Sequence, residues 1–147
     1  MRYEFTVVQT ATAPIDVVWD VIADATRWSE WGRFKVSRLE VDGAPVPNGV
    51  GALRVFGNPP VVSREEVVVF DAPHHLAYEL RSGLPINGYR ADVHLEADGD
   101  TTRITWTGGF DRARPAFTSA GFRAFLHRFI ADTAKRAAAT AEARARG

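Results

Sequence analysis

The chain has 147 residues, with 18 basic and 18 acidic side chains and no cysteine. This length suits one domain over residues 1–147, and a zero net charge gives no general attraction to nucleic acid. The lack of cysteine excludes disulfides, thiolate metal ligands and thiol catalysis. Neither an apolar run of membrane-spanning length nor an apolar signal core is visible, so we expect a cytoplasmic protein without a membrane span.

The N-terminal third is predicted to hold one strand and two short helices. Residues 3–11 are rich in β-branched and aromatic side chains, which favours a strand. Pro14 suits the first turn of a helix, and the apolar residues after it share one helical face. Asp24 is predicted to cap a second helix, 25–31, and Gly32 to end it.

Six further strands are expected in the middle of the chain. Their apolar and polar residues alternate, and turn sequences containing Gly, Pro or Asp separate them. Strands that follow one another without helices predict an antiparallel sheet in an α+β domain, with one face buried and one facing solvent. The predicted strands are 34–41, 52–56, 61–70, 76–81, 89–97 and 101–110.

A single long helix is predicted from Pro115 to the end of the chain. Its apolar side chains recur at steps of three and four residues: Phe122, Phe125, Leu126, Phe129, Ile130 and Thr133. The Ala-rich turns from Ala134 onward are predicted to extend beyond the core and fray. Because one helix cannot fill a sheet of seven strands wrapped around it, we expect a cavity between them.

Three segments carry a resemblance to a known family: "APIDVVWDVIADATRWSEW", "REEVVVFDAPHHLAYELRSGLP" and "YRADVHLEADGDTTRITWTGGF". With this order of elements, the chain resembles the START-like (SRPBCC) superfamily, in its bacterial polyketide cyclase/dehydrase and lipid-transport branch. The resemblance implies a helix-grip fold: a seven-stranded curved antiparallel sheet wrapped around the C-terminal helix. The two short helices would then support that helix at one end of the cavity, with Trp28 and Trp31 packed there. The alternative is that one of these tryptophans lines a ligand entrance. Fold alone does not choose among the carriers, receptors and enzymes of this superfamily.

The inward faces of the strands and helix are predicted to form a ligand-binding pocket. The alternative is that the same side chains fill a solid core. Two tyrosine hydroxyls favour the pocket, because a buried hydroxyl needs a hydrogen-bonding partner that a ligand or water can supply. The predicted ligand-binding residues are Tyr78, Tyr89, Val93, Trp106, Phe122, Phe125 and Phe129.

The segment "SREE" holds the two candidate catalytic residues, Arg64 and Glu65, which face opposite sides of their strand. An inward Glu65 would have a raised pKa in an apolar cavity and would serve as an acid or base. An inward Arg64 would instead hold a ligand carboxylate. The alternative is that both are solvated charges paired across strands.

No metal or cofactor is expected, because the four histidines match no common metal-binding spacing. The strand alternation places Arg90, Asp92 and His94 outward. The remaining histidines are expected in a turn or on a helix flank: His74, His75 and His127.

Three functions remain open at this point. The first is binding or transport of a small hydrophobic molecule such as a lipid, a sterol-like compound or a polyketide. The second is a polyketide cyclase or dehydratase that uses the same cavity, and the third is a regulatory protein that binds a partner. The loops 56–60 and 82–88 are predicted to border the cavity mouth, with Leu84 and Ile86 exposed at a loop tip. No nucleic-acid partner is expected, and the oligomeric state stays open between monomer and homodimer.

Overall fold

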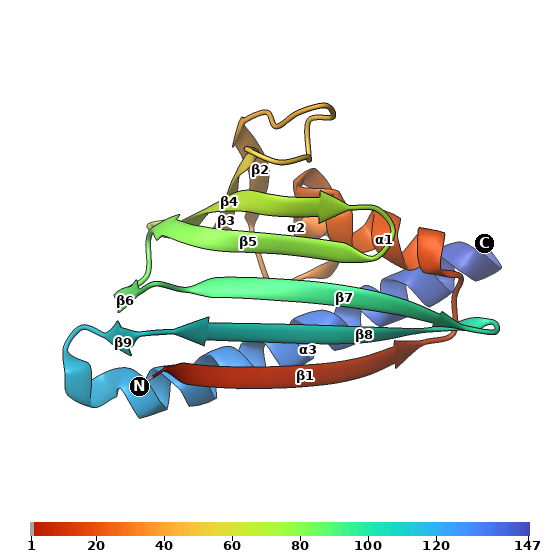
Figure 1. Ribbon diagram of the computed structural model, residues 1–147. Helices are drawn as coiled ribbons and strands as arrows, with labels where there is room; N and C mark the ends of the chain where they lie inside the picture. Colours follow the sequence, from red (N-terminus) through yellow and green to blue (C-terminus); the bar gives the residue numbers. More distant parts are fainter. Residues whose placement is uncertain (1) are drawn as a thin grey trace.

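A computed structural model describes residues 2–147 as a curved sheet with one long helix across one face (Figure 1). Seven antiparallel strands form the sheet in the order β1-β8-β7-β5-β4-β3-β2. This architecture confirms the predicted α+β helix-grip fold. The strands are β1 Tyr3–Ala11, β2 Val36–Val41, β3 Leu53–Asn58, β4 Val61–Asp71, β5 His75–Ser82, β7 Arg90–Asp98 and β8 Thr101–Phe110.

Alternating side chains set which face of the sheet is buried. Along β7, Ala91, Val93 and Leu95 are buried and alternate with more exposed polar residues. The antiparallel register places Val93 opposite Trp106 and Leu95 opposite Ile104 on β8, so apolar side chains of neighbouring strands meet on the same face.

A second, two-stranded sheet was not expected from the sequence. It pairs β6 (Ile86–Asn87) with β9 (Arg112–Ala113), and β6 lies inside the segment predicted as a loop. Such short strands carry too few residues for a recognisable alternation.

The two short helices form where the sequence predicts them, with one local difference. Helix α1 spans Ile15–Ala23, and the Asp24 side chain accepts a hydrogen bond from the Thr26 backbone N–H. The segment after Asp24 begins as a 3₁₀ turn, Ala25–Arg27, before the α-helical turn α2, Trp28–Trp31, which ends at Gly32.

Helix α3, Ser119–Arg146, follows a 3₁₀ turn at Ala116–Thr118 and runs along β1 in the same direction (Figure 1). Helix α3 stays in contact with this part of the chain toward its C-terminus, where Glu142 accepts a hydrogen bond from the Thr12 N–H, just after β1, at 2.8 Å. The prediction that the Ala-rich turns extend beyond the core is wrong. Their small side chains let the helix approach β1 and α1 closely, and four of them are buried: Ala134, Ala137, Ala138 and Ala141.

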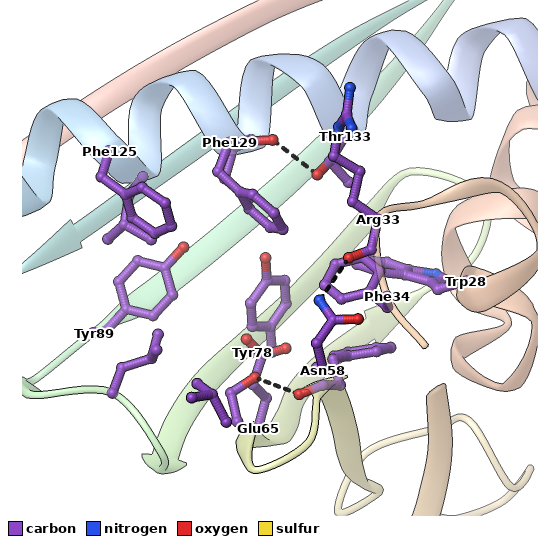
Figure 2. A pocket seen from close by; sticks show the side chains of 17 residues that line it. Trp28, Arg33, Phe34, Asn58, Glu65, Tyr78, Tyr89, Phe125, Phe129 and Thr133 are labelled. Atoms are coloured by element: carbon purple, nitrogen blue, oxygen red, sulfur yellow. Dashed lines mark hydrogen bonds between the residues drawn. The ribbon is translucent and has the colours of Figure 1, made fainter. Parts of the chain in front are cut away.

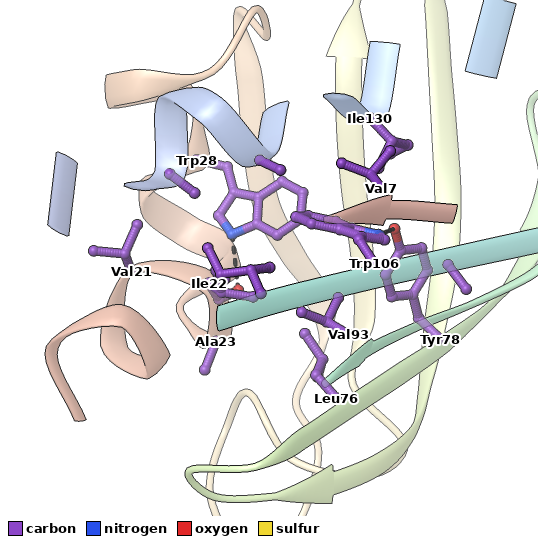
Figure 3. Packing of buried hydrophobic residues seen from close by; sticks show 14 of the residues in the cluster. Val7, Val21, Ile22, Ala23, Trp28, Leu76, Tyr78, Val93, Trp106 and Ile130 are labelled. Atoms are coloured by element: carbon purple, nitrogen blue, oxygen red, sulfur yellow. Dashed lines mark hydrogen bonds between the residues drawn. The ribbon is translucent and has the colours of Figure 1, made fainter. Parts of the chain in front are cut away.

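The interior is densely packed near the short helices (Figure 3). Trp28 stacks on Phe56 at 4.6 Å between ring centroids and meets Trp106 edge-on at 5.8 Å. Both indoles are also hydrogen-bonded: Trp28 Nε1 donates to the Ile22 carbonyl, and Trp106 Nε1 donates to the Tyr78 hydroxyl. These bonds fix the orientation of the large rings around which the smaller side chains pack.

Among residues 2–147, no helix combines the length and the hydropathy needed to cross a membrane.

The packing at Gly108 generates a test of this arrangement. Gly108 lies opposite Phe5, and a Cβ at residue 108 would collide with the Phe5 ring, which stacks on His127 of α3. We expect Gly108→Ala to lower the free energy of unfolding by about 1–3 kcal/mol, because the ring must shift in a packed core. Urea denaturation followed by tryptophan fluorescence measures the change.

The neighbouring Gly109→Ala is the matched control. A Cβ there would meet the flexible Glu4 side chain at 3.1 Å, so we expect a loss below about 0.5 kcal/mol. Equal losses for both variants would show that the Phe5 contact does not constrain the fold.

Candidate ligand-binding cavity

A cavity of about 180 Å³ lies between the sheet and the N-terminal half of α3. Figure 2 shows Phe125 and Phe129 of α3 on one side of it, with Tyr78 and Tyr89 on the other. Apolar and aromatic side chains form most of its wall, and its polar groups come from several elements, three of them from β3 and β4. The polar lining residues are Arg33, Asn58, Ser63, Glu65, Tyr78, Tyr89 and Thr133.

The seven residues predicted to bind a ligand divide into two groups. Four of them line the cavity: Tyr78, Tyr89, Phe125 and Phe129. The other three do not reach it and belong to the packed part of the interior. Val93 and Trp106 are enclosed within the core, and Phe122 packs edge-on against Phe110 at 6.2 Å. Alternation shows which side chains point inward, but not where large rings already fill the space.

A buried ion pair that the sequence analysis did not identify stands beside the cavity. Arg54 on β3 lies opposite Glu65 on β4, and Arg54 Nη2 donates to Glu65 Oε1 at 2.9 Å. Only 1% of Arg54 and 8% of Glu65 are exposed. A signal was present in the sequence: Arg54 stands between Ala52 and Phe56 at the inward positions of its strand.

Aromatic rings surround the Arg54 guanidinium. Its central carbon lies 4.9 Å from the Trp28 ring centroid, 4.8 Å from that of Phe56 and 4.4 Å from that of Tyr78. Among the described residues, Arg54 Nε and Nη1 have no hydrogen-bonding partner. Cation–π attraction from the rings and the hydrogen bond to the Glu65 carboxyl therefore compensate for the missing hydration of this charge.

Burial shifts the proton affinities of the three acidic groups at this end of the cavity. Loss of hydration raises the pKa of Glu65 despite the opposing effect of Arg54. Burial, reinforced by the charge of Glu65, also raises the pKa of Tyr78. Tyr89 has a raised pKa from burial and from its interaction with Tyr78. Both tyrosines are therefore neutral hydroxyl donors over the physiological pH range.

Arg64, the second candidate catalytic residue, does not reach the cavity. Its Nε lies 3.3 Å from Glu40 Oε1 on the opposite face of the sheet, and about a third of its side chain is exposed. Because alternate residues of a strand face opposite sides, an inward Glu65 requires an outward Arg64. Arg64 is therefore not positioned to hold a ligand carboxylate in this cavity.

The loop residues border the cavity unequally. Leu84, Gly57 and Asn58 line it, whereas Ile86 is buried, which corrects its expected place at an exposed loop tip. Gly57 has a φ of 150°, and a Cβ there would collide with the Val61 carbonyl, so the turn beside the cavity requires glycine. Phe125, although it lines the cavity, is 55% exposed, which places an opening beside it.

Comparison with known proteins gives one family and several similar structures. The family described as "Polyketide cyclase / dehydrase and lipid transport" matches residues 2–144. No curated protein sequence is significantly similar to the chain.

Norcoclaurine synthase from Thalictrum flavum, a point mutant in complex with a transition-state analogue, is 18% identical with a TM-score of 0.75, covering 98% of this chain and 96% of that one. Its complex with dopamine and hydroxybenzaldehyde is 19% identical with a TM-score of 0.72, at 94% and 85% coverage. The protein XoxI from Bacillus cereus is 15% identical with a TM-score of 0.70, at 97% and 94% coverage. At these identities the similarities show a shared fold.

The buried ion pair generates a stability prediction. We expect Arg54→Met and Glu65→Leu each to lower the free energy of unfolding by about 3–5 kcal/mol, because each leaves an uncompensated buried charge. The double variant should be less destabilised than either single variant, since two apolar side chains replace both charges. Urea denaturation of the four proteins measures the coupling.

Arg64→Met provides the control, because the exposed Arg64–Glu40 pair contributes at most about 1 kcal/mol. Additive losses for Arg54→Met and Glu65→Leu would contradict a coupled buried pair.

Proposed function

The chain belongs to the polyketide cyclase/dehydrase and lipid transport family, and from this membership and its apolar cavity we propose that it binds a small hydrophobic molecule. The observation that carries the proposal is a cavity lined mostly by apolar and aromatic side chains, with a few polar groups among them. This distribution is typical of ligand pockets, where apolar walls supply affinity and a few polar groups set orientation.

The cavity volume favours a ligand about the size of one substituted aromatic ring. An apolar cavity of about 150 Å³ is large enough to hold benzene, and this cavity measures about 180 Å³. A sterol-like compound or a long lipid chain would have to extend through the opening beside Phe125. Within the family's range, the geometry therefore supports a compact ligand over a large one.

The polar wall favours a ligand with a hydroxyl, carbonyl or amine at one end. Arg54 donates a hydrogen bond to Glu65 Oε1, whereas Glu65 Oε2 has no hydrogen bond to another residue of the described chain. Tyr78 accepts a hydrogen bond from Trp106, which leaves its own hydroxyl proton to donate. A ligand placed with its ring against Phe129 would therefore present its polar end to both a donor and an acceptor.

Titration with single-ring probes tests the proposal. We expect hydroxybenzaldehyde to bind one-to-one in calorimetry and native mass spectrometry, since its ring and hydroxyl match the two walls. Ser63→Phe should weaken this binding at least about tenfold, because the new ring occupies the cavity beside Glu65. Palmitate and a sterol serve as the larger probes.

Val62→Phe is the matched control: the same ring is added one residue earlier on β4, on the face away from the cavity. Equal weakening by both variants, or no saturable binding of any probe, would contradict the proposal.

A second candidate function is proton transfer in the same cavity, as a cyclase or dehydratase of polyketide-like substrates. The observation that favours it is the raised pKa of Glu65, a carboxyl that lines the same cavity as Tyr78 and Tyr89. A carboxyl with a raised pKa holds and releases protons closer to neutral pH, as acid–base catalysis requires.

Carbon-13 chemical shifts of the Glu65 carboxyl test this second candidate. We expect a titration midpoint above the ordinary value of 4.5, because burial disfavours the charged form. Arg54→Met should move the midpoint further upward, since Arg54 opposes the rise. A midpoint at or below 4.5 would contradict an acid–base role at neutral pH.

Turnover tests directly whether Glu65 transfers the proton in this second candidate function. Loss of water from an aromatic β-hydroxy ketone, followed by mass spectrometry, should stop in Glu65→Gln while the substrate still binds. Unchanged turnover in this variant would exclude Glu65 as the proton-transferring group.

A further inference from the structure

Two histidines and an aspartate gather on the face of the sheet opposite the cavity. His75 begins β5 and lies opposite His94 in the antiparallel register with β7. Asp92 stands two residues before His94 on β7 and therefore shares its face. The buried residues between them, Leu76 and Val93, point the other way into the core. The sheet thus brings together side chains from two strands that are neighbours in Figure 1.

The donor atoms of this trio are already close together. His75 Nε2 lies 2.7 Å from Asp92 Oδ2, and the His75 and His94 rings stack with centroids 4.0 Å apart. One ligand atom from each of the three residues lies within 4.8 Å of the others. In a tetrahedral site with bonds of about 2.0–2.1 Å, ligand atoms stand roughly 3.3 Å apart. Small side-chain rotations therefore convert the observed arrangement into a coordinating one.

The electrostatic surroundings suit a divalent cation. Ion pairs connect three carboxylates near the site with two guanidinium groups, so this connected group carries a net charge of −1 with neutral histidines. The carboxylates belong to Glu66, Glu79 and Asp92, and the guanidinium groups to Arg81 and Arg90. Asp71, the register partner of His75 on β4, adds a further carboxylate at its edge.

Arg90 orients the Asp92 carboxylate through two hydrogen bonds. Its Nε donates to Asp92 Oδ1 at 3.1 Å and its Nη2 to Oδ2 at 3.2 Å. Each carboxylate oxygen has two lone pairs, and the second one of Oδ2 faces His75 Nε2 at 2.7 Å, where a bound metal ion would replace this hydrogen bond. Hydrogen bonds such as those from Arg90 to a metal-binding carboxylate hold it in place and tune the site.

We propose that His75, Asp92 and His94 form a surface site for a transition-metal ion of the zinc type. Two imidazole nitrogens and one carboxylate oxygen match the ligand preference of Zn²⁺ and Co²⁺, and they disfavour Mg²⁺ and Ca²⁺, which take oxygen ligands. Three protein ligands on an exposed face leave the remaining position to water. The bound ion would connect β5, which carries Tyr78, to β7, which begins one residue after Tyr89.

The spacing of the histidines in the sequence gave no sign of this site. His75 and Asp92 are separated by a turn, a short strand and a loop, and only the pairing of β5 with β7 makes them neighbours. The site does not depend on the proposed function, because it lies on the opposite face of the sheet from the cavity.

Binding of Zn²⁺ to the full chain, freed of any polyhistidine tag, tests the proposal. We expect one-to-one binding in calorimetry, a rise in Tm with Zn²⁺ that a chelator reverses, and no rise with Mg²⁺. Co²⁺ should give d–d absorption bands of a low-coordinate site. His94→Ala and Asp92→Asn should each weaken Zn²⁺ binding at least about tenfold, because each removes a ligand.

His74→Ala is the matched control. His74 is next to His75 in the sequence, but its own Nδ1 faces the Leu95 carbonyl at 3.5 Å. It should leave Zn²⁺ affinity unchanged. In the unsubstituted protein, nitrogen-15 spectra should show Zn²⁺ shifting the ring signals of His75 and His94 but not those of His74 and His127. The proposal is overturned if no saturable binding occurs, if His74→Ala weakens binding as much as His94→Ala, or if the ring signals of His75 and His94 do not shift.

Discussion

The ion pair between Arg54 and Glu65 constrains the rest of the interior. A guanidinium removed from water needs compensation, and a single carboxylate supplies only part of it. The remainder comes from Trp28, Phe56 and Tyr78, whose rings surround the charge. Since these rings come from α2, β3 and β5, the pair can be enclosed only when the short helix and the two strands are all in place.

This enclosure divides the interior into a filled part and an open part. On the side of α1 and α2, large rings with hydrogen-bonded indoles pack closely, and Trp28 forms the edge of the cavity wall. On the side of the α3 N-terminus, Phe125 and Phe129 face the sheet across a gap. The ion pair stands at the boundary, so an otherwise apolar cavity acquires a polar end.

The two faces of the sheet have different chemistry for one reason, the alternation of side chains along each strand. On β4, alternation directs Glu65 inward and Arg64 outward, and on β7 it directs Val93 inward and both Asp92 and His94 outward. The inner face thus carries rings and a buried acid, whereas the outer face gathers charged groups and imidazoles. The two sites proposed for this sheet are therefore chemically unrelated.

The sequence by itself determined the seven strands of the main sheet, the long helix and the cap at Asp24, because periodicity and capping are local properties. The resemblance of three segments indicated the family. Strand alternation and the helical repeat also identified four of the side chains around the cavity, since both report which residues point inward. Only the tertiary structure decided that Val93 and Trp106 are core rather than cavity wall, and that the Ala-rich end of α3 is buried. It alone paired Arg54 with Glu65 and His75 with His94. These outcomes depend on which strands become neighbours and on how large rings share a limited volume, and neither is encoded within a single segment.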